Sequence, residues 1–186
     1  MSLYIDAWLS MFEQHRPLGT HYIVAQTNLR PCNRSKAQID QFQAKTSKAL
    51  RHALNCFTSM VNPGHVRRAR NQPDQLRPSS LCTIEFLNPN VLQCQTVHAN
   101  VILGNISKEF STADIERFFR HSWNEKAGQL GKVHVQELNS EHTTFDYIFK
   151  EAKRNPELAI DCFGTVDLPN FFVPRNPAFS DLSQKR

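Results

Sequence analysis

The sequence predicts an α+β fold with a central, largely antiparallel β-sheet and helices mainly on one face of it. Short runs alternate apolar and polar residues, as strands do, and longer runs place apolar residues at helical spacing. Along the chain these segments follow the order α-β-α-β-β-α-β-α. If the helices cover one face of the sheet, the other face is free to carry a site.

The composition indicates a globular domain that favours an anionic partner. With 186 residues, 40% of them hydrophobic, the chain can build one domain with a substantial core. Its net charge of +5 favours nucleic acid, although a basic surface that only aids solubility is the simpler interpretation. No run approaches the roughly 20 apolar residues of a membrane span, and Asp6 and Glu13 are not typical of a signal peptide.

Cysteine usage suggests a reducing compartment. The chain has five cysteines and no C-x-x-C pair, and Cys82 and Cys94 lie inside apolar, strand-like runs. Free, buried thiols explain this pattern. We therefore expect an intracellular protein.

The first half of the chain predicts a helix, a strand and a second, longer helix. Residues 3–12 form an amphipathic pattern, and residues 20–30 are rich in strand formers. Ser35 is a helix cap, and the helix that follows it is expected to end near Met60. The buried stripe of this helix is expected to comprise Ile39, Phe42, Leu50, Ala53 and Phe57.

A basic connection follows over residues 62–80. It holds four arginines against a single acid, with three prolines and a glycine that oppose regular structure. Such a segment suits a phosphate backbone, but it is equally typical of a solvated surface loop. The candidate DNA-binding residues are Arg67, Arg68, Arg70, Lys45 and Lys48.

The second half predicts a hairpin, a helix, a strand and a last helix. The hairpin strands are 81–87 and 92–103, and a capped helix begins after Ser111. Its Phe118, Phe119 and Trp123 are at helical spacing and are expected in the core rather than on a base-stacking surface. Residues 131–138 alternate as a strand. The expected divisions are an N-terminal helix over 1–18, a domain over 19–155 and a C-terminal extension over 156–186.

The hairpin carries candidate metal ligands. Because strand side chains alternate, matching the apolar faces of the two strands puts Glu85 and His98 on one face. A carboxylate and an imidazole so placed can hold Mg²⁺ or Mn²⁺, with Asn100 or Thr96 as a weaker oxygen ligand. A lone strand histidine is also commonly a plain hydrogen-bonding residue, and both interpretations stay open.

The last helix carries a tyrosine on its polar side. In "TTFDYIFKEAKRNPE" the apolar side consists of Phe145, Ile148, Phe149 and Ala152. Tyr147 and Lys150 lie on the opposite side. A tyrosine there faces either solvent or a substrate.

This ordered set of motifs resembles the HUH endonucleases, above all the rolling-circle replication initiators of plasmids and small single-stranded DNA viruses. In that family one strand carries His-U-His, with U apolar, and the preceding strand carries an acidic metal ligand. A downstream helix carries Y-x-x-K with a nucleophilic tyrosine. The family's first motif has only a loose counterpart here, in "HYIVAQTN".

The resemblance implies a role for each matching residue. "DYIFKEA" makes Tyr147 the nucleophile and Lys150 its companion. "TVHANVIL" is a degenerate match, in which His98 is the second histidine with Thr96 replacing the first, or the first with Asn100 replacing the second. Circovirus initiators also replace one of the two histidines with an amide residue. Glu85 stands where the acidic ligand is expected.

The function implied by the resemblance is metal-dependent nicking and joining of single-stranded DNA through a 5′-phosphotyrosine. The implied cofactor is Mg²⁺ or Mn²⁺, and the implied partner is a single-stranded or hairpin DNA origin. The sequence has no P-loop, so any helicase would be a separate protein or a missing domain. The implied location is the cytoplasm for a bacterial or plasmid-borne protein and the nucleus for a eukaryotic virus.

Three alternatives remain. A single-strand transposase or a relaxase would use the same chemistry, and relaxases usually place the tyrosine near the N-terminus, where Tyr4 and Tyr22 lie. A non-catalytic nucleic-acid-binding module, such as a repressor on an RRM-like sheet, would tolerate the degenerate histidine motif. An unrelated α+β protein would carry these motifs by chance.

Overall fold

A computed structural model of the chain describes residues 19–62, 78–85 and 96–138. These residues form four strands, two α-helices and one π-helical turn. In chain order the elements are β1 (Gly19–Gln26), α2 (Lys36–Val61), β2 (Ser79–Glu85), β3 (His98–Gly104), α5 (Thr112–Arg120), η2 (His121–Lys126) and β4 (Val133–Glu137). Across these three ranges, no helix has the length and apolar character to cross a membrane.

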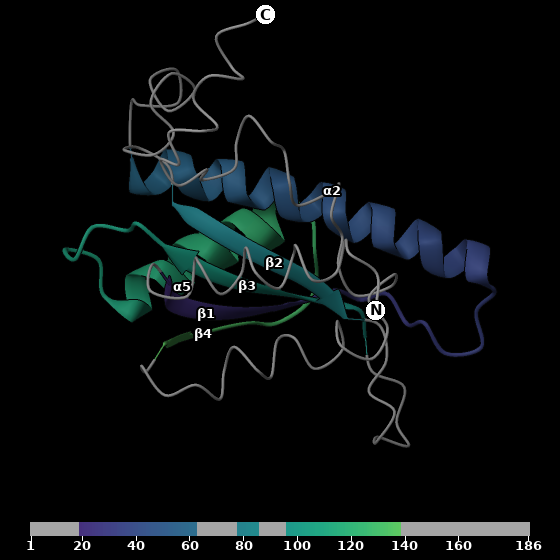
Figure 1. Ribbon diagram of the computed structural model, residues 1–186. Coiled ribbons are helices and arrows are strands. Elements are labelled where there is room, and N and C mark those ends of the chain that lie inside the picture. The colour runs from purple at the N-terminus through teal and green to yellow at the C-terminus, as the bar shows by residue number, and fades with distance from the viewer. Residues whose placement is uncertain (1–18, 63–77, 86–95, 139–186) are drawn as a thin grey trace, which may run out of the picture.

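The four strands form one antiparallel sheet in the order β2-β3-β1-β4 (Figure 1). A helix lies between β1 and β2 in the chain, and another between β3 and β4. This chain order and strand order are those of the split βαβ, ferredoxin-like arrangement, in which β1 and β3 occupy the centre. The predicted α+β class is confirmed.

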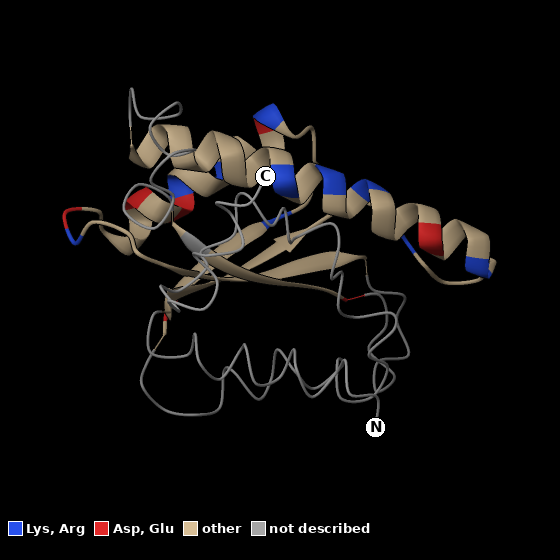
Figure 2. Ribbon diagram, turned by 45° about the horizontal axis from the view of Figure 1, so that its top comes forward, with Lys and Arg blue, Asp and Glu red and all other residues tan. Residues whose placement is uncertain are grey.

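Both α-helices and η2 lie on one face of the sheet, as Figure 2 shows from a second angle. The core between the layers joins Ile23 of β1 and Val101 of β3 to Leu50 and Phe57 of α2 and to Trp123 of η2. The predicted helical stripe is confirmed for its central and C-terminal part, which is fully buried, whereas the stripe residues of the first turns are half-buried. Those first turns pack on Ile84 and Val97 in a second, smaller cluster.

Both predicted helix caps are present. The Ser35 hydroxyl accepts from the Gln38 backbone N–H at the start of α2, and Gln38 accepts in return from the Ser35 backbone N–H. Ser111 and Asp114 form the same reciprocal pair at α5. Hydrogen bonds from the Ser111 side chain and backbone lower the pKa of the Asp114 carboxyl. The caps satisfy backbone donors that the helix leaves free.

The strand predicted over 20–30 ends early, at Gln26. The Thr27 hydroxyl and backbone N–H both bond to the Val97 carbonyl, at 2.7 and 2.9 Å, and this pairing continues the chain outside the regular ladder. The strand-forming residues after Gln26 therefore lie outside the regular strand, because the hydrogen bonds of Thr27 to Val97 replace those of the ladder.

The helix after Ser111 also continues further than its first regular part, as the π-helix η2. The Ala127 N–H bonds to the Ser122 carbonyl five residues earlier. The indole N–H of Trp123 donates to the Gln26 carbonyl at 2.7 Å. Helix periodicity predicts Trp123 in the core, which is confirmed, but does not predict this widening of the helix.

The cysteine prediction is wrong at one position. Cys56 and Cys82 are free, but Cys32, between β1 and α2, is disulfide-bonded. The absence of C-x-x-C pairs concerns only cysteines that are close in the sequence. A disulfide requires that the two Cα atoms lie close in space, whatever their separation in the sequence. The cysteine pattern therefore does not support a reducing compartment by itself.

Several predicted segments lie outside the described residues. They are the helix over 3–12, most of the basic connection, the hairpin turn, the helix that carries Tyr147 and the C-terminal extension.

Candidate metal and phosphate site

The face of the sheet opposite the helices carries the candidate site. We call it the open face because no described helix packs on it, although most of its side chains on β2 and β3 are buried. The register pairs Glu85 with His98 and His98 with Gln26, so these three residues form a row across β2, β3 and β1. Ile84 and Ala99, their neighbours in the chain, pack on the helix side. The prediction that Glu85 and His98 share a face on neighbouring strands is therefore confirmed.

Glu85 and His98 contact each other directly. The Nε2 atom of His98 lies 2.7 Å from Oε2 of Glu85, and its Nδ1 lies 3.2 Å from the Thr96 carbonyl oxygen. A carbonyl oxygen and an ionised carboxylate both only accept. A neutral His98 ring can therefore donate to one of them, and a protonated ring can donate to both.

A divalent ion held by both side chains would require them to separate and to turn. Ligand atoms about 2.1 Å from an octahedral ion lie roughly 3.0 Å apart when they are neighbours, and their lone pairs then point at the ion rather than at each other. A metal-binding imidazole commonly donates its other N–H to a backbone carbonyl, and the Thr96 carbonyl lies where it could accept from Nδ1 of His98. Within the described ranges no group of three or more His, Cys, Asp or Glu side chains gathers. Water and substrate oxygens would have to complete the shell, as is usual for Mg²⁺.

Asn100 is held by other hydrogen bonds. Its Oδ1 accepts from the Tyr22 hydroxyl at 2.7 Å, and its Nδ2 donates to the Thr83 hydroxyl at 3.4 Å. Its side chain is 1% exposed. Recruiting Asn100 as a metal ligand would disturb this buried network. Thr96 acts through its backbone carbonyl, which orients the His98 ring.

Tyr22 is poorly suited to be a nucleophile. Its side chain is 5% exposed, and its hydroxyl is the donor in the hydrogen bond to Asn100. The relaxase alternative would therefore need Tyr4, which lies outside the described residues.

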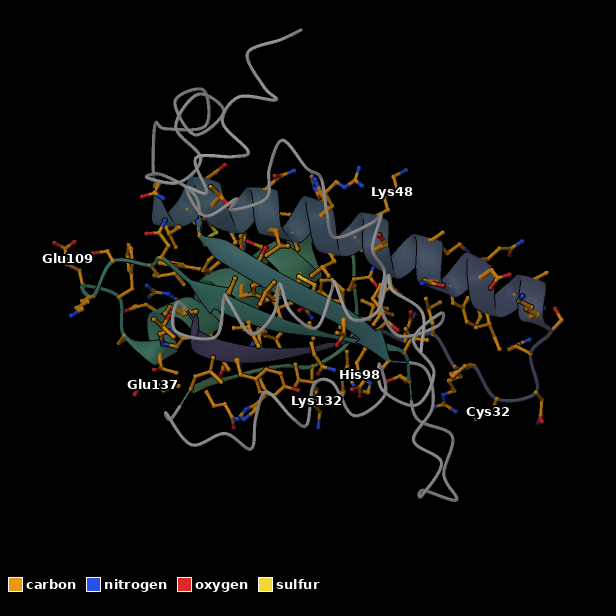
Figure 3. The ribbon with its side chains drawn as sticks, in the orientation of Figure 1. Cys32, Lys48, His98, Glu109, Lys132 and Glu137 are labelled. Carbon is orange, nitrogen blue, oxygen red and sulfur yellow. The ribbon has the colours of Figure 1, made fainter. Side chains whose placement is uncertain are left out.

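The remaining predicted site residues are separated from the pair or not described. Lys45 and Lys48 are exposed on α2, and Lys48 points away from the sheet (Figure 3). The sheet thus lies between these lysines and the Glu85–His98 pair. The positions outside the described residues are Tyr147, Lys150, Arg67, Arg68 and Arg70.

The structure adds two polar residues to the row that the sequence did not single out. Gln26 is the cross-strand partner of His98, and its side chain is exposed. Lys132, also exposed, continues the row at β4, because the Gln26 N–H bonds to its carbonyl at 2.8 Å. Alternation along β1 puts Gln26 on the face of Tyr22, but only the register shows that it adjoins His98.

Comparison of the chain with protein-family models, with curated proteins and with solved structures gave no match.

Proposed function

We propose that this protein nicks and rejoins single-stranded DNA in a divalent-metal-dependent reaction, initiating rolling-circle replication of a plasmid or small DNA element. The observation that supports the proposal best is the Glu85–His98 pair. Its two side chains meet on the open face of the sheet, with Nε2 of His98 2.7 Å from Oε2 of Glu85. The order of motifs in the sequence supplies the second support, with Tyr147 and Lys150 in a downstream segment whose pattern predicts a helix.

Glu85 and His98 would hold the metal, and Thr96 would fix the ring of His98 through its carbonyl. The Gln26 side chain adjoins this position as an uncharged oxygen donor. A bound Mg²⁺ or Mn²⁺ would draw electron density from the non-bridging oxygens of a phosphate. The protein residues orient the ion, and so orient the phosphate for in-line attack.

Tyr147 would act as the nucleophile. A bond forms between its Oη and the scissile phosphorus, the bond from phosphorus to the 3′ oxygen breaks, and the 3′ oxygen takes up a proton to leave as a 3′-OH. A tyrosine phenol ordinarily has a pKa of about 10, so its proton must depart to solvent or a base as it attacks. In the helix that the sequence predicts, Lys150 would lie one turn from Tyr147 and would favour the phenolate. Attack by a 3′-OH on the phosphotyrosine reverses the steps and joins the strand.

The DNA contacts divide between the two faces of the molecule. Lys45 and Lys48 lie on the helix layer, so their proposed phosphate contacts are to DNA outside the strand being cut. Arg67, Arg68 and Arg70 keep their proposed role as phosphate contacts from the basic connection.

A covalent-adduct assay tests the proposal. The full chain is incubated with 5′- or 3′-labelled single-stranded DNA pools and Mn²⁺, and SDS-stable adducts are measured on a denaturing gel. We expect an adduct that carries the DNA 3′ of the cut and is absent in Tyr147→Phe, in Glu85→Ala and after chelation. Tyr4→Phe is the matched tyrosine control and should keep the adduct. Equal adduct in Tyr147→Phe and wild type would refute Tyr147 as the nucleophile.

A non-catalytic nucleic-acid-binding module is the second candidate. It is favoured by the direct Glu85–His98 contact, which a single proton also satisfies, and by the bonds that occupy Asn100. The described residues of the open face include no Phe or Trp, and their one tyrosine, Tyr22, is buried, so only the imidazoles of His98 and His134 could stack on a base. This candidate predicts a gel shift without any adduct.

A further inference from the structure

We propose that Lys132, beside Gln26 at the β4 end of the row, binds a backbone phosphate of a single-stranded nucleic acid that reaches the Glu85–His98 pair from the β4 side of the sheet. The inference rests on the proposed function for the class of its ligand. Its physical basis is a difference in side-chain exposure across the open face, where side chains are mostly buried on β2 and β3 and exposed toward β4.

On the β2 and β3 side of the open face most described side chains are buried. Thr83, Asn100 and Ile102 are each 2% exposed or less, and Leu81 is 4% exposed. Glu85 is itself 6% exposed. These side chains therefore offer a polymer little surface to contact.

The β4 side of the same face is accessible and polar. Gln26, Lys132, His134 and Gln136 all have exposed side chains. His98, which lies between the two sides, is partly buried, with its side chain 18% exposed. The accessible surface next to His98 therefore lies over β1 and β4.

The charge on this path suits a phosphate. Lys132 takes part in no ion pair within the described ranges. The acid of β4, Glu137, points to the helix layer, where its carboxylate accepts from the Thr112 hydroxyl at 2.8 Å. Lys132 therefore has no neighbouring carboxylate on the described open face other than Glu85, which lies three strands away and faces His98.

The spacing is also suitable. Neighbouring strands lie about 4.8 Å apart, so the backbone of Lys132 is roughly 10 Å from that of His98. Figure 3 shows both labelled residues at the same end of the sheet. A phosphate group and a lysine side chain together span such a gap, while Gln26, between them, can donate its amide N–H to the same phosphate.

Salt-dependent binding tests the inference without metal or catalysis. The affinity of the full chain for a labelled single-stranded oligonucleotide is measured by fluorescence anisotropy in chelator, from 50 to 200 mM salt. Each phosphate contact on a single strand contributes about 0.7 to the slope of log affinity against log salt. We expect Lys132→Ala to lower the slope by about that amount, so that the loss of affinity over this range is roughly threefold smaller than in wild type.

Two matched variants complete the experiment. Lys126→Ala removes an exposed lysine from η2 on the helix layer and should leave the slope unchanged. Lys132→Arg keeps the charge and should keep the wild-type slope. Equal slopes in Lys132→Ala and Lys126→Ala, or no binding by wild type, would overturn the inference. A lower slope in Lys132→Ala together with no Mn²⁺-dependent adduct in wild type would instead support the phosphate contact and reject the nickase.

Discussion

Replacing Tyr22 by phenylalanine tests whether Asn100 is a structural residue. The substitution removes the donor of the 2.7 Å hydrogen bond to Asn100 and leaves Oδ1 of that residue buried, at 1% exposure, without this donor. Loss of one partner of a buried hydrogen bond costs about 1–3 kcal/mol. For a domain of this size the slope of unfolding free energy against urea is on the order of 1–3 kcal/mol per molar, so the midpoint should fall by about 1 M.

Urea unfolding followed by circular dichroism measures this effect. The double variant Tyr22→Phe/Asn100→Ala separates the pair from its surroundings, and the coupling energy of the two changes should be about 0.5–3 kcal/mol. A midpoint for Tyr22→Phe within error of wild type, or a coupling energy of zero, would refute the structural role. Asn100 would then be free to serve as the amide ligand that the sequence allows.

Two further predictions concern the packing around the sheet. Burial lowers the pKa of His21 more than the nearby Glu137 carboxylate raises it, so the folded protein binds the His21 proton less tightly than the unfolded chain. The contribution of His21 to the free energy of unfolding is therefore fully present above about pH 6.5 and is lost as the pH falls below that value. The urea midpoints at pH 7.5 and pH 5.5 should accordingly differ less in His21→Gln than in wild type. A side chain at Gly131 would lie 1.9 Å from the Gln26 carbonyl oxygen, so Gly131→Ala should destabilise the fold by about 1–3 kcal/mol in thermal melting. An unchanged melting temperature would show that β1 can move away from residue 131.

The structure places the two parts of the proposed DNA interface, the lysines of α2 and the Glu85–His98 pair, on opposite sides of the sheet. The sequence groups Lys45 and Lys48 with the other candidate phosphate contacts, because basic residues on a helix are all equivalent when only composition is known. In the fold, α2 covers one face of the sheet and the Glu85–His98 pair lies on the other. A single strand bound at the pair, as we propose, would meet Gln26 and Lys132 first, and not the lysines of α2.

Local patterns in the sequence determined where the two described α-helices begin and which faces of the described strands are apolar. Ser35 and Ser111 mark helix starts because their hydroxyls satisfy donors only two or three residues away. Glu85 and His98 were placed on one face because alternation has a fixed period and the apolar sides of paired strands must both be buried. The resemblance to HUH endonucleases rests on the same local motifs.

The tertiary structure alone decided which residues meet across strands. Three contacts depend on residues that are far apart in the sequence. They are the pairing of Gln26 with His98, the hydrogen bond of Tyr22 to Asn100 and the disulfide of Cys32. Strand register is set by the whole sheet and its packing on the helices, and one residue of slippage would exchange the two faces. The physical reason is that the period of a strand or helix determines which face of the element a side chain lies on. Which residue of another element it contacts is determined only when segments distant in the sequence pack together.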